Sequence, residues 1–184
     1  MEKVFEDELR TIKTDNVREF CECMLEAAPE YFYTVPASAT GKYHPKFALG
    51  NGGLVRHTKA VVRILNDILE LEMYRSVFSE REMDLLRVAA ILHDSKKYGD
   101  KGSKYPVFDH PLIASEWVLD AEVDADISRD DRKFIADAIA SHMGQFNTSK
   151  FCPGVILPKP VTEAEKIVHL CDYIASRRDI FDAE

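Results

Sequence analysis

Residues 81–94 carry apolar side chains on nearly every face of a helix, and this segment constrains the fold more than any other. Its apolar residues are Met83, Leu85, Leu86, Val88, Ala89, Ala90, Ile91 and Leu92. Because a surface helix keeps a polar face for solvent, a helix that is apolar nearly all round belongs in the middle of a protein. The longest apolar run, Val88 to Leu92, is far shorter than the roughly 20 residues that cross a bilayer. The segment therefore predicts a central buried helix rather than a membrane span.

Five further stretches repeat apolar residues every three or four positions, the spacing of one face of an α-helix. They cover about residues 17–28, 54–71, 111–119, 134–144 and 162–178. Pro111 fits the first position of its helix, and Thr162 fits the N-cap of the last one. We find no convincing alternation of apolar and polar residues that would indicate a strand. The predicted fold class is therefore all-α, a compact helical bundle.

The length of 184 residues fits one domain, and neither an internal repeat nor a Gly/Ser-rich linker divides the chain. We expect a single domain over residues 1–184, with a core at about 50–180 and an N-terminal helical extension at about 1–30. Three connections are longer than the roughly two to eight residues usual between packed helices. We expect lids or binding loops there, with disorder as the alternative. These connections are residues 29–53, 95–109 and 144–161.

The formal net charge of −8 is unevenly distributed along the chain. Residues 1–30 and 120–131 each carry a net charge of −5, whereas residues 95–104 carry +3. An acidic protein lacks the surplus of Lys and Arg with which proteins that coat duplex DNA neutralise phosphates. The charge therefore excludes general duplex coating as the expected function. It leaves room for a local site that binds a small phosphate ester or a nucleic-acid end.

Cysteine usage and the N-terminal sequence predict a cytoplasmic protein with no membrane partner. Residues 1–8 are acidic and lack the positively charged start and apolar core of a secretion signal. The cysteines form no Cys-x-x-Cys motif, which favours reduced thiols over a disulfide framework. They are Cys21, Cys23, Cys152 and Cys171.

Histidine and aspartate residues recur at the ends and on the apolar faces of the expected helices. His57 lies at the start of one helix, and the pair His93–Asp94 ends the most buried one. His142 and Asp172 share the apolar stripes of their helices. A carboxylate that faces a core needs a partner, because an unpaired buried charge is very costly. A lone interior histidine is more often a hydrogen-bonded core residue, but the joint order His, His-Asp, His, His, Asp predicts a metal site.

This ordered pattern, with the residues around it, resembles the HD-domain metal-dependent phosphohydrolase superfamily over about residues 50–180. A lead-in, Gly41-Lys42-Tyr43-His44-Pro45, is similar to small stand-alone HD proteins of bacteria and phages. The segments that carry the resemblance are Gly52-Gly53-Leu54-Val55-Arg56-His57-Thr58, Ala89-Ala90-Ile91-Leu92-His93-Asp94-Ser95-Lys96-Lys97-Tyr98, Asp109-His110-Pro111, Ser141-His142 and Cys171-Asp172-Tyr173-Ile174-Ala175-Ser176-Arg177.

The resemblance implies an all-α core that binds one or two divalent metal ions. Asp94 would bridge the two ions and take part in catalysis. The family often continues the doublet as His-Asp-x-Gly-Lys, so that Lys97 falls on the lysine position while Lys96 replaces the glycine. The metal would be Fe, Mn, Ni, Co or Zn, with Mg possible. The implied ligands are His57, His93, Asp94 and Asp172, with His110 and His142 added for the second ion.

The predicted function is hydrolysis of a phosphomonoester or phosphodiester of a nucleotide or short oligonucleotide. Metal ions lower the pKa of a bound water from about 15.7 towards about 7, which supplies the nucleophile at neutral pH. Lys97 is the second predicted catalytic residue, because it can contact a substrate phosphate or the attacking water. Predicted substrate contacts are Lys96, Lys97, Lys101, Lys104 and Tyr43, with Tyr98 and Phe108 as further candidates for stacking a base.

Two alternatives remain open on the sequence alone. An HD-fold di-iron oxygenase would use the same order of six ligands, so the ligands do not separate it from a hydrolase. A non-catalytic, metal-binding regulatory module would keep the site for structure, although a purely structural site needs no open position. The oligomeric state is open as well.

Overall fold

The computed structural model describes residues 4–38, 41, 42 and 44–181. Tyr43, a predicted substrate contact, lies outside the described residues. In sequence order the elements are α1 (Glu6–Leu9), α2 (Asp15–Glu26), η2 (Glu30–Tyr33), η3 (Lys46–Ala48), α3 (Gly53–Leu69), α4 (Glu72–Arg75), α5 (Glu80–Leu92), α6 (His110–Asp120), α7 (Arg129–Ala140), β1 (Thr148–Ser149), β2 (Cys152–Ile156), α8 (Glu163–Ala175) and α9 (Arg178–Phe181).

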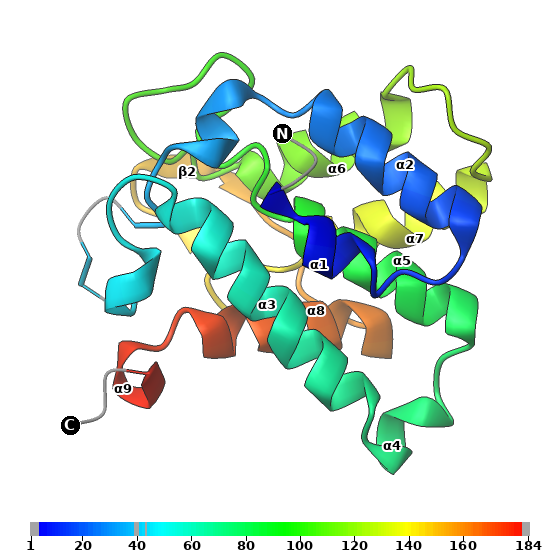
Figure 1. Cartoon of the computed structure of the whole chain (residues 1–184). Coiled ribbons are helices and arrows are strands. Elements are labelled where there is room, and N and C mark those ends of the chain that lie inside the picture. Colours follow the sequence, from blue (N-terminus) through cyan, green and yellow to red (C-terminus); the bar gives the residue numbers. More distant parts are fainter. Residues whose placement is uncertain (1–3, 39–40, 43, 182–184) are drawn as a thin grey trace.

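The apolar helix predicted at residues 81–94 is α5, and it lies in the middle of the fold (Figure 1). Every residue from Asp84 to Leu92 is buried, and α5 packs against α2, α3, α7 and α8. The all-α fold class is therefore confirmed. The six principal helices, α2, α3 and α5 to α8, each begin within five residues of the predicted boundary.

One helix begins earlier than predicted because its first turn is polar. The prediction placed the start of α7 at residue 134, where its apolar stripe begins, whereas the helix starts at Arg129. The hydroxyl oxygen of Ser128 accepts a hydrogen bond from the backbone N–H of Asp131 at 3.1 Å, which is an N-cap. The predicted cap at Thr162 is confirmed, since its hydroxyl accepts from the backbone N–H of Glu165 at 3.2 Å.

The N-terminal helices pack on the same core as the rest of the chain. Phe20 and Met24 of α2 are fully buried within that core. The buried carboxylate of Asp84 in α5 accepts hydrogen bonds from the backbone N–H groups of Lys13 and Thr14 at 3.1 and 2.8 Å. The segment between α1 and α2 thus supplies partners to one oxygen of this buried carboxylate, and Arg87 of α5 donates to the other at 2.8 Å.

A short antiparallel hairpin, β1 and β2, lies within residues 144–161 and was not predicted. Neither strand buries one face while exposing the other. In β2, Cys152 and Val155 are partly covered and the other residues are exposed. Without one-sided burial there is no alternation of apolar and polar residues for a sequence pattern to reveal.

The four cysteines are free thiols, as expected. No helix within the described residues combines the length and apolar character needed to cross a bilayer.

Candidate metal centre

His57 is brought into the interior by the way α3 begins. Gly52 adopts a left-handed conformation with φ of 69°, and α3 starts at the next residue. A Cβ atom on Gly53 would lie 2.3 Å from the carbonyl oxygen of Ala48, so only glycine allows this close approach to η3. The imidazole of His57, one turn into α3, is fully buried.

Each of the three other imidazoles is oriented by a hydrogen bond to a nearby backbone carbonyl oxygen. The Nδ1 atom of His93, which directly follows α5, lies 2.8 Å from the carbonyl oxygen of Ala90. The Nδ1 atoms of His110 and His142 contact the carbonyl oxygens three residues before them, at 2.8 and 2.7 Å. A carbonyl oxygen only accepts, so each Nδ1 carries the proton and each Nε2 keeps a free lone pair. This tautomer is the one that metal-binding histidines use.

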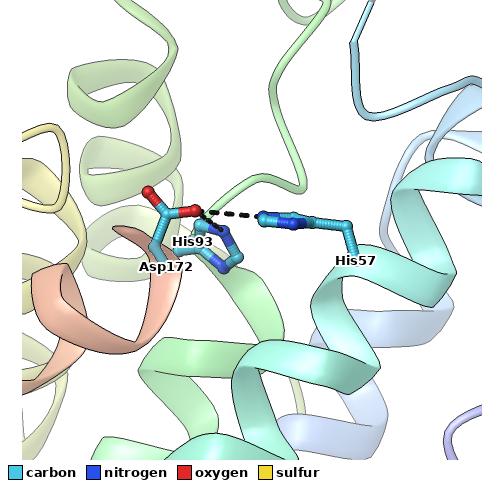
Figure 2. A group of neighbouring side chains, drawn as sticks. All are labelled: His57, His93 and Asp172. Atoms are coloured by element: carbon cyan, nitrogen blue, oxygen red, sulfur yellow. Dashed lines mark hydrogen bonds and ion pairs between the residues drawn. The ribbon is translucent and has the colours of Figure 1, made fainter. Parts of the chain in front are cut away.

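Asp172, on α8, completes a first cluster with two of these imidazoles (Figure 2). Its Oδ1 atom lies 3.0 Å from Nε2 of His57 and 3.7 Å from Nε2 of His93. The three residues come from α3, the end of α5 and α8, which are far apart in the sequence. Packing of α3 against α5 and α8 brings them together.

Asp94 faces two groups of histidines with its two carboxylate oxygens. Its Oδ2 atom lies 3.8 Å from Nε2 of His57 and 3.5 Å from Nε2 of His93. Its Oδ1 atom lies 3.0 Å from Nε2 of His110 and 3.7 Å from Nε2 of His142. The six predicted ligands therefore converge, with Asp94 between the two groups.

The residues of this cluster fit a metal ion by geometry and by chemistry. His57, His93 and Asp172 each place one ligand atom within 4.8 Å of the others, and so do His93, Asp94 and His142. Nε2 of His93 and Oδ1 of Asp94 are buried and have no hydrogen-bond partner among the described residues. Buried polar atoms without partners are costly, and a divalent cation would satisfy both. Imidazole and carboxylate together suit divalent transition metals.

Three of the clustered residues are held in the protonation states that a metal requires. Burial opposes ionisation of Asp94, but the ammonium of Lys97 and the neighbouring imidazoles of His93 and His110 outweigh it and hold the pKa of Asp94 well below its usual value. The pKa of Asp172 is likewise lowered, chiefly by the hydrogen bond from His57. Burial and the neighbouring imidazoles lower the pKa of His142 to about 3. At neutral pH both carboxylates are charged and His142 is neutral.

The four predicted lysines lie in different surroundings. Nζ of Lys97 lies 2.5 Å from Oδ2 of Asp94. Burial by itself would lower the pKa of Lys97, but the charge of this carboxylate outweighs burial and raises it. Lys96 points elsewhere: its Nζ atom lies 3.0 Å from Asp100 and 4.6 Å from the ring centroid of Trp117. Lys104 is exposed and lines a cavity that also contacts Asp94 and Asp172. Lys101 is exposed as well, but it does not line this cavity. The structure therefore lends no support to Lys96 and Lys101 as substrate contacts.

A cavity of about 970 Å³ opens from Asp94 and Asp172 to the surface. All three long connections contribute to its wall. Phe108, a candidate stacking residue, is in this wall, whereas Tyr98 is buried and its hydroxyl donates to the carbonyl oxygen of Pro36 at 3.3 Å. The contributions of the connections include Ala37, Ser38, Val107, Phe108, Phe146 and Phe151.

Sequence reasoning assigned no role to several residues that line this cavity. His44 lies with its ring centroid 5.5 Å from that of His57, and burial lowers its pKa to about 4. Tyr173 and Arg177 follow Asp172 on and just after α8. Both belong to a segment that carries the family resemblance and lie close to Asp172, but neither signal shows which side chains reach a cavity.

His169 supports the centre without being part of it. Its Nδ1 atom donates to the carbonyl oxygen of His142 at 2.6 Å. Gly144, with φ of 56°, leaves the space that this ring needs, because a Cβ there would lie 2.2 Å from it. His169 thus fixes the turn that carries His142.

Comparison with known proteins adds one finding. A model of the HD domain matches residues 54–177, a range that contains all six residues of the cluster. Neither the curated proteins nor the solved structures include a match.

Proposed function

The chain belongs to the HD domain family, and from this premise we propose that it is a metal-dependent phosphohydrolase. Proteins with this domain are typically metal-dependent phosphohydrolases that bind divalent ions. The substrate that we propose is a phosphomonoester or phosphodiester of a nucleotide or short oligonucleotide. The observation that carries the proposal is the placement of Asp94 between two groups of histidines, with a cavity opening from it.

We propose two metal positions around Asp94. His57, His93 and Asp172 would hold the first ion together with Oδ2 of Asp94. His110 and His142 would hold the second together with Oδ1. Four neutral imidazoles and two carboxylates contribute about −2, so two divalent ions would leave the centre at about +2, a charge that attracts phosphate. When bound, such ions activate water and stabilise the negative charge that develops on the phosphoryl group.

Lys97 is the protein cation closest to this chemistry. Its contact with Oδ2 of Asp94 fixes the carboxylate, and its ammonium adds a positive charge at the floor of the cavity. We propose that it contacts an oxygen of the reacting phosphate or hydrogen-bonds the attacking water. Lys104, exposed at the cavity, would attract the phosphate as a mobile point charge.

The cavity suits a small substrate rather than a duplex. Its volume of about 970 Å³ lies at the upper end of the range of roughly 300–1,000 Å³ found for small-molecule sites. Phe108 and Phe146 provide aromatic surface on which a base can stack. This combination favours a nucleotide or a short oligonucleotide.

The proposal is tested with purified protein loaded with Mn²⁺ and with bis-p-nitrophenyl phosphate as substrate. We expect turnover, about two metal ions per chain by elemental analysis, and loss of both in His93→Ala. Lys159→Ala, at an exposed residue outside the cavity, is the control and should behave like the wild type. Absence of turnover with Mn²⁺, Fe²⁺, Ni²⁺, Co²⁺ and Zn²⁺ would contradict hydrolysis. Substrate-dependent O₂ consumption by the iron-loaded protein would establish the oxygenase instead.

A further inference from the structure

Arg177 presents a charged group to the cavity that opens from Asp94 and Asp172. It lies two residues beyond the end of α8 and lines the cavity together with Ser176. Its Cζ atom lies 4.5 Å from the ring centroid of Tyr173, which is close enough for a cation–π contact. Its Nη2 atom donates to the hydroxyl oxygen of Ser176 at 3.1 Å. The guanidinium is therefore held in one place by an aromatic ring and a hydroxyl.

Within residues 4–38, 41, 42 and 44–181, the same guanidinium has no anionic partner. Its Nε atom is buried without a hydrogen-bond partner there, and no carboxylate of these residues forms an ion pair with the group within 4.0 Å. Asp94 and Asp172, the cavity carboxylates of the centre, are engaged by Lys97 and the imidazoles instead. An arginine carries a positive charge, so a half-buried guanidinium that forms no ion pair with the described residues can receive an external anion.

Arg177 is set apart from the metal ligands by its place in the chain and by its contacts. It lies two residues beyond the end of α8, the helix that carries Asp172. Its guanidinium packs on Tyr173 and makes no ion pair with the carboxylates of the centre. We propose that Arg177 binds a second, non-reacting phosphate of the substrate, so that the site prefers substrates with two phosphates over those with one. This inference rests on the proposed phosphohydrolase function.

The shared chemistry of such substrates is a phosphate next to the scissile one. It could come from the neighbouring nucleotide of a short oligonucleotide or from the second phosphate of a nucleoside bisphosphate. An arginine fork can bind phosphate through two parallel hydrogen bonds, which a lysine cannot reproduce. The fixed guanidinium would thus act as a specificity-determining group.

The test compares kcat/KM for three substrates in the Mn²⁺-loaded protein. Bis-p-nitrophenyl phosphate carries one phosphate, the 5′-phosphorylated thymidine dinucleotide carries two, and thymidine 3′,5′-bisphosphate carries two on one nucleoside. We expect Arg177→Gln to lower kcat/KM for a two-phosphate substrate about 10- to 100-fold more than for the one-phosphate substrate, because hydrogen bonds to charged groups are the strong ones. Arg177→Lys should lie between. Whichever two-phosphate substrate shows the effect identifies the source of the second phosphate.

A purely structural role for Arg177 predicts a different result. Its loss would then lower kcat/KM for all three substrates by the same factor, and that outcome would overturn the inference. Arg129→Gln, an exposed arginine at the start of α7, is the matched control and should leave all three values unchanged. Equal kcat/KM of the wild type and Arg177→Gln for both two-phosphate substrates would overturn it as well.

A binding measurement separates failure of this inference from failure of the proposed function. In EDTA, fluorescence anisotropy of the dinucleotide carrying a 3′ fluorescein reports binding without turnover. We expect Arg177→Gln to bind at least about fivefold more weakly than the wild type, while Arg129→Gln binds equally. If the wild type hydrolyses nothing but shows this difference, the hydrolase is wrong and the anion site stands. Equal binding by the wild type and Arg177→Gln, or none up to about 1 mM, refutes the anion site.

Discussion

The floor and the mouth of the cavity differ in almost every physical respect. At the floor, His57, His93 and Asp94 are at most 1% exposed, and they lie on or directly beside helices that pack on one another. At the mouth, Phe146 is 50% exposed and Phe151 is 84% exposed, and both lie on a connection that contains only a short hairpin. The same cavity thus has one rigid, buried end and one open end.

The difference follows from what each end has to do. Metal ligands need fixed positions, and hydrogen bonds from imidazole Nδ1 atoms to local carbonyl oxygens supply them at three of the four histidines. A mouth that admits and releases substrate needs exposed loops with few buried contacts. We therefore expect activity to depend on single atoms at the floor and to tolerate larger changes at the mouth.

The largest effect is expected from a substitution of Asp94, at the centre of the cavity floor. Asp94→Asn keeps the shape of the side chain but removes the negative charge that faces both histidine groups. We expect the variant to bind less than one metal ion per chain and to lose about 10³-fold or more of its kcat for bis-p-nitrophenyl phosphate, because metals supply several kcal/mol of transition-state stabilisation. Elemental analysis and steady-state kinetics measure the two effects. Retention of both metal and activity would show that Asp94 is not a ligand.

The second effect is the pH dependence of folding stability that the buried imidazole of His142 causes. The pKa of His142 is lowered to about 3 in the folded protein against about 6.5 when unfolded. As the pH falls below 6.5, the unfolded state binds a proton that the folded state refuses, so this group removes stability on acidification. Between pH 7 and pH 5 the loss amounts to about 2 kcal/mol.

The matching experiment compares wild type and His142→Gln, both in EDTA, by chemical unfolding at pH 7 and pH 5. The variant lacks the titrating imidazole, so its free energy of unfolding should fall by about 2 kcal/mol less over this range. The raised pKa of His93 acts in the opposite direction in both proteins, and the difference isolates His142. Parallel pH profiles would contradict a neutral, buried imidazole at this position.

The smallest effect is expected at the mouth. Phe151 lies at the tip of the hairpin, and the ammonium of Lys150 lies 5.0 Å from the centroid of its ring. Phe151→Ser should change the free energy of unfolding by no more than about 0.5 kcal/mol, as is usual for exposed positions. It should alter kcat for bis-p-nitrophenyl phosphate by less than about twofold. A drop in the thermal midpoint of several degrees, measured by calorimetry, would show that the hairpin belongs to the core after all.

Features encoded by neighbouring residues could be predicted. The central helix, the Thr162 cap and the free cysteines all follow from residues close together in the sequence. The six residues of the cluster were found because their order along the chain resembles a family pattern. The hairpin was missed because its burial does not alternate, and the start of α7 was missed because a polar first turn has no apolar signal.

Lys96 and Lys97 show where such prediction ends. The two residues are adjacent and chemically identical, and the sequence suggested a phosphate contact for both. In the fold one ammonium lies beside Asp94 and the other lies between Asp100 and Trp117. Neighbours in a turn point in different directions, and what each direction meets depends on elements that pack there from elsewhere in the chain.

The sequence by itself determined the helices, the order of the cluster residues and the positive charge of the segment after His93–Asp94. These properties depend on side-chain periodicity and residue type, which are local. The tertiary structure alone decided that the two oxygens of Asp94 face different histidines and that Arg177 stands in the cavity with no carboxylate partner in the part of the chain that the structure describes. Both are distances between elements far apart in the chain, and such distances exist only once α3, α5, α7 and α8 have packed around a common core.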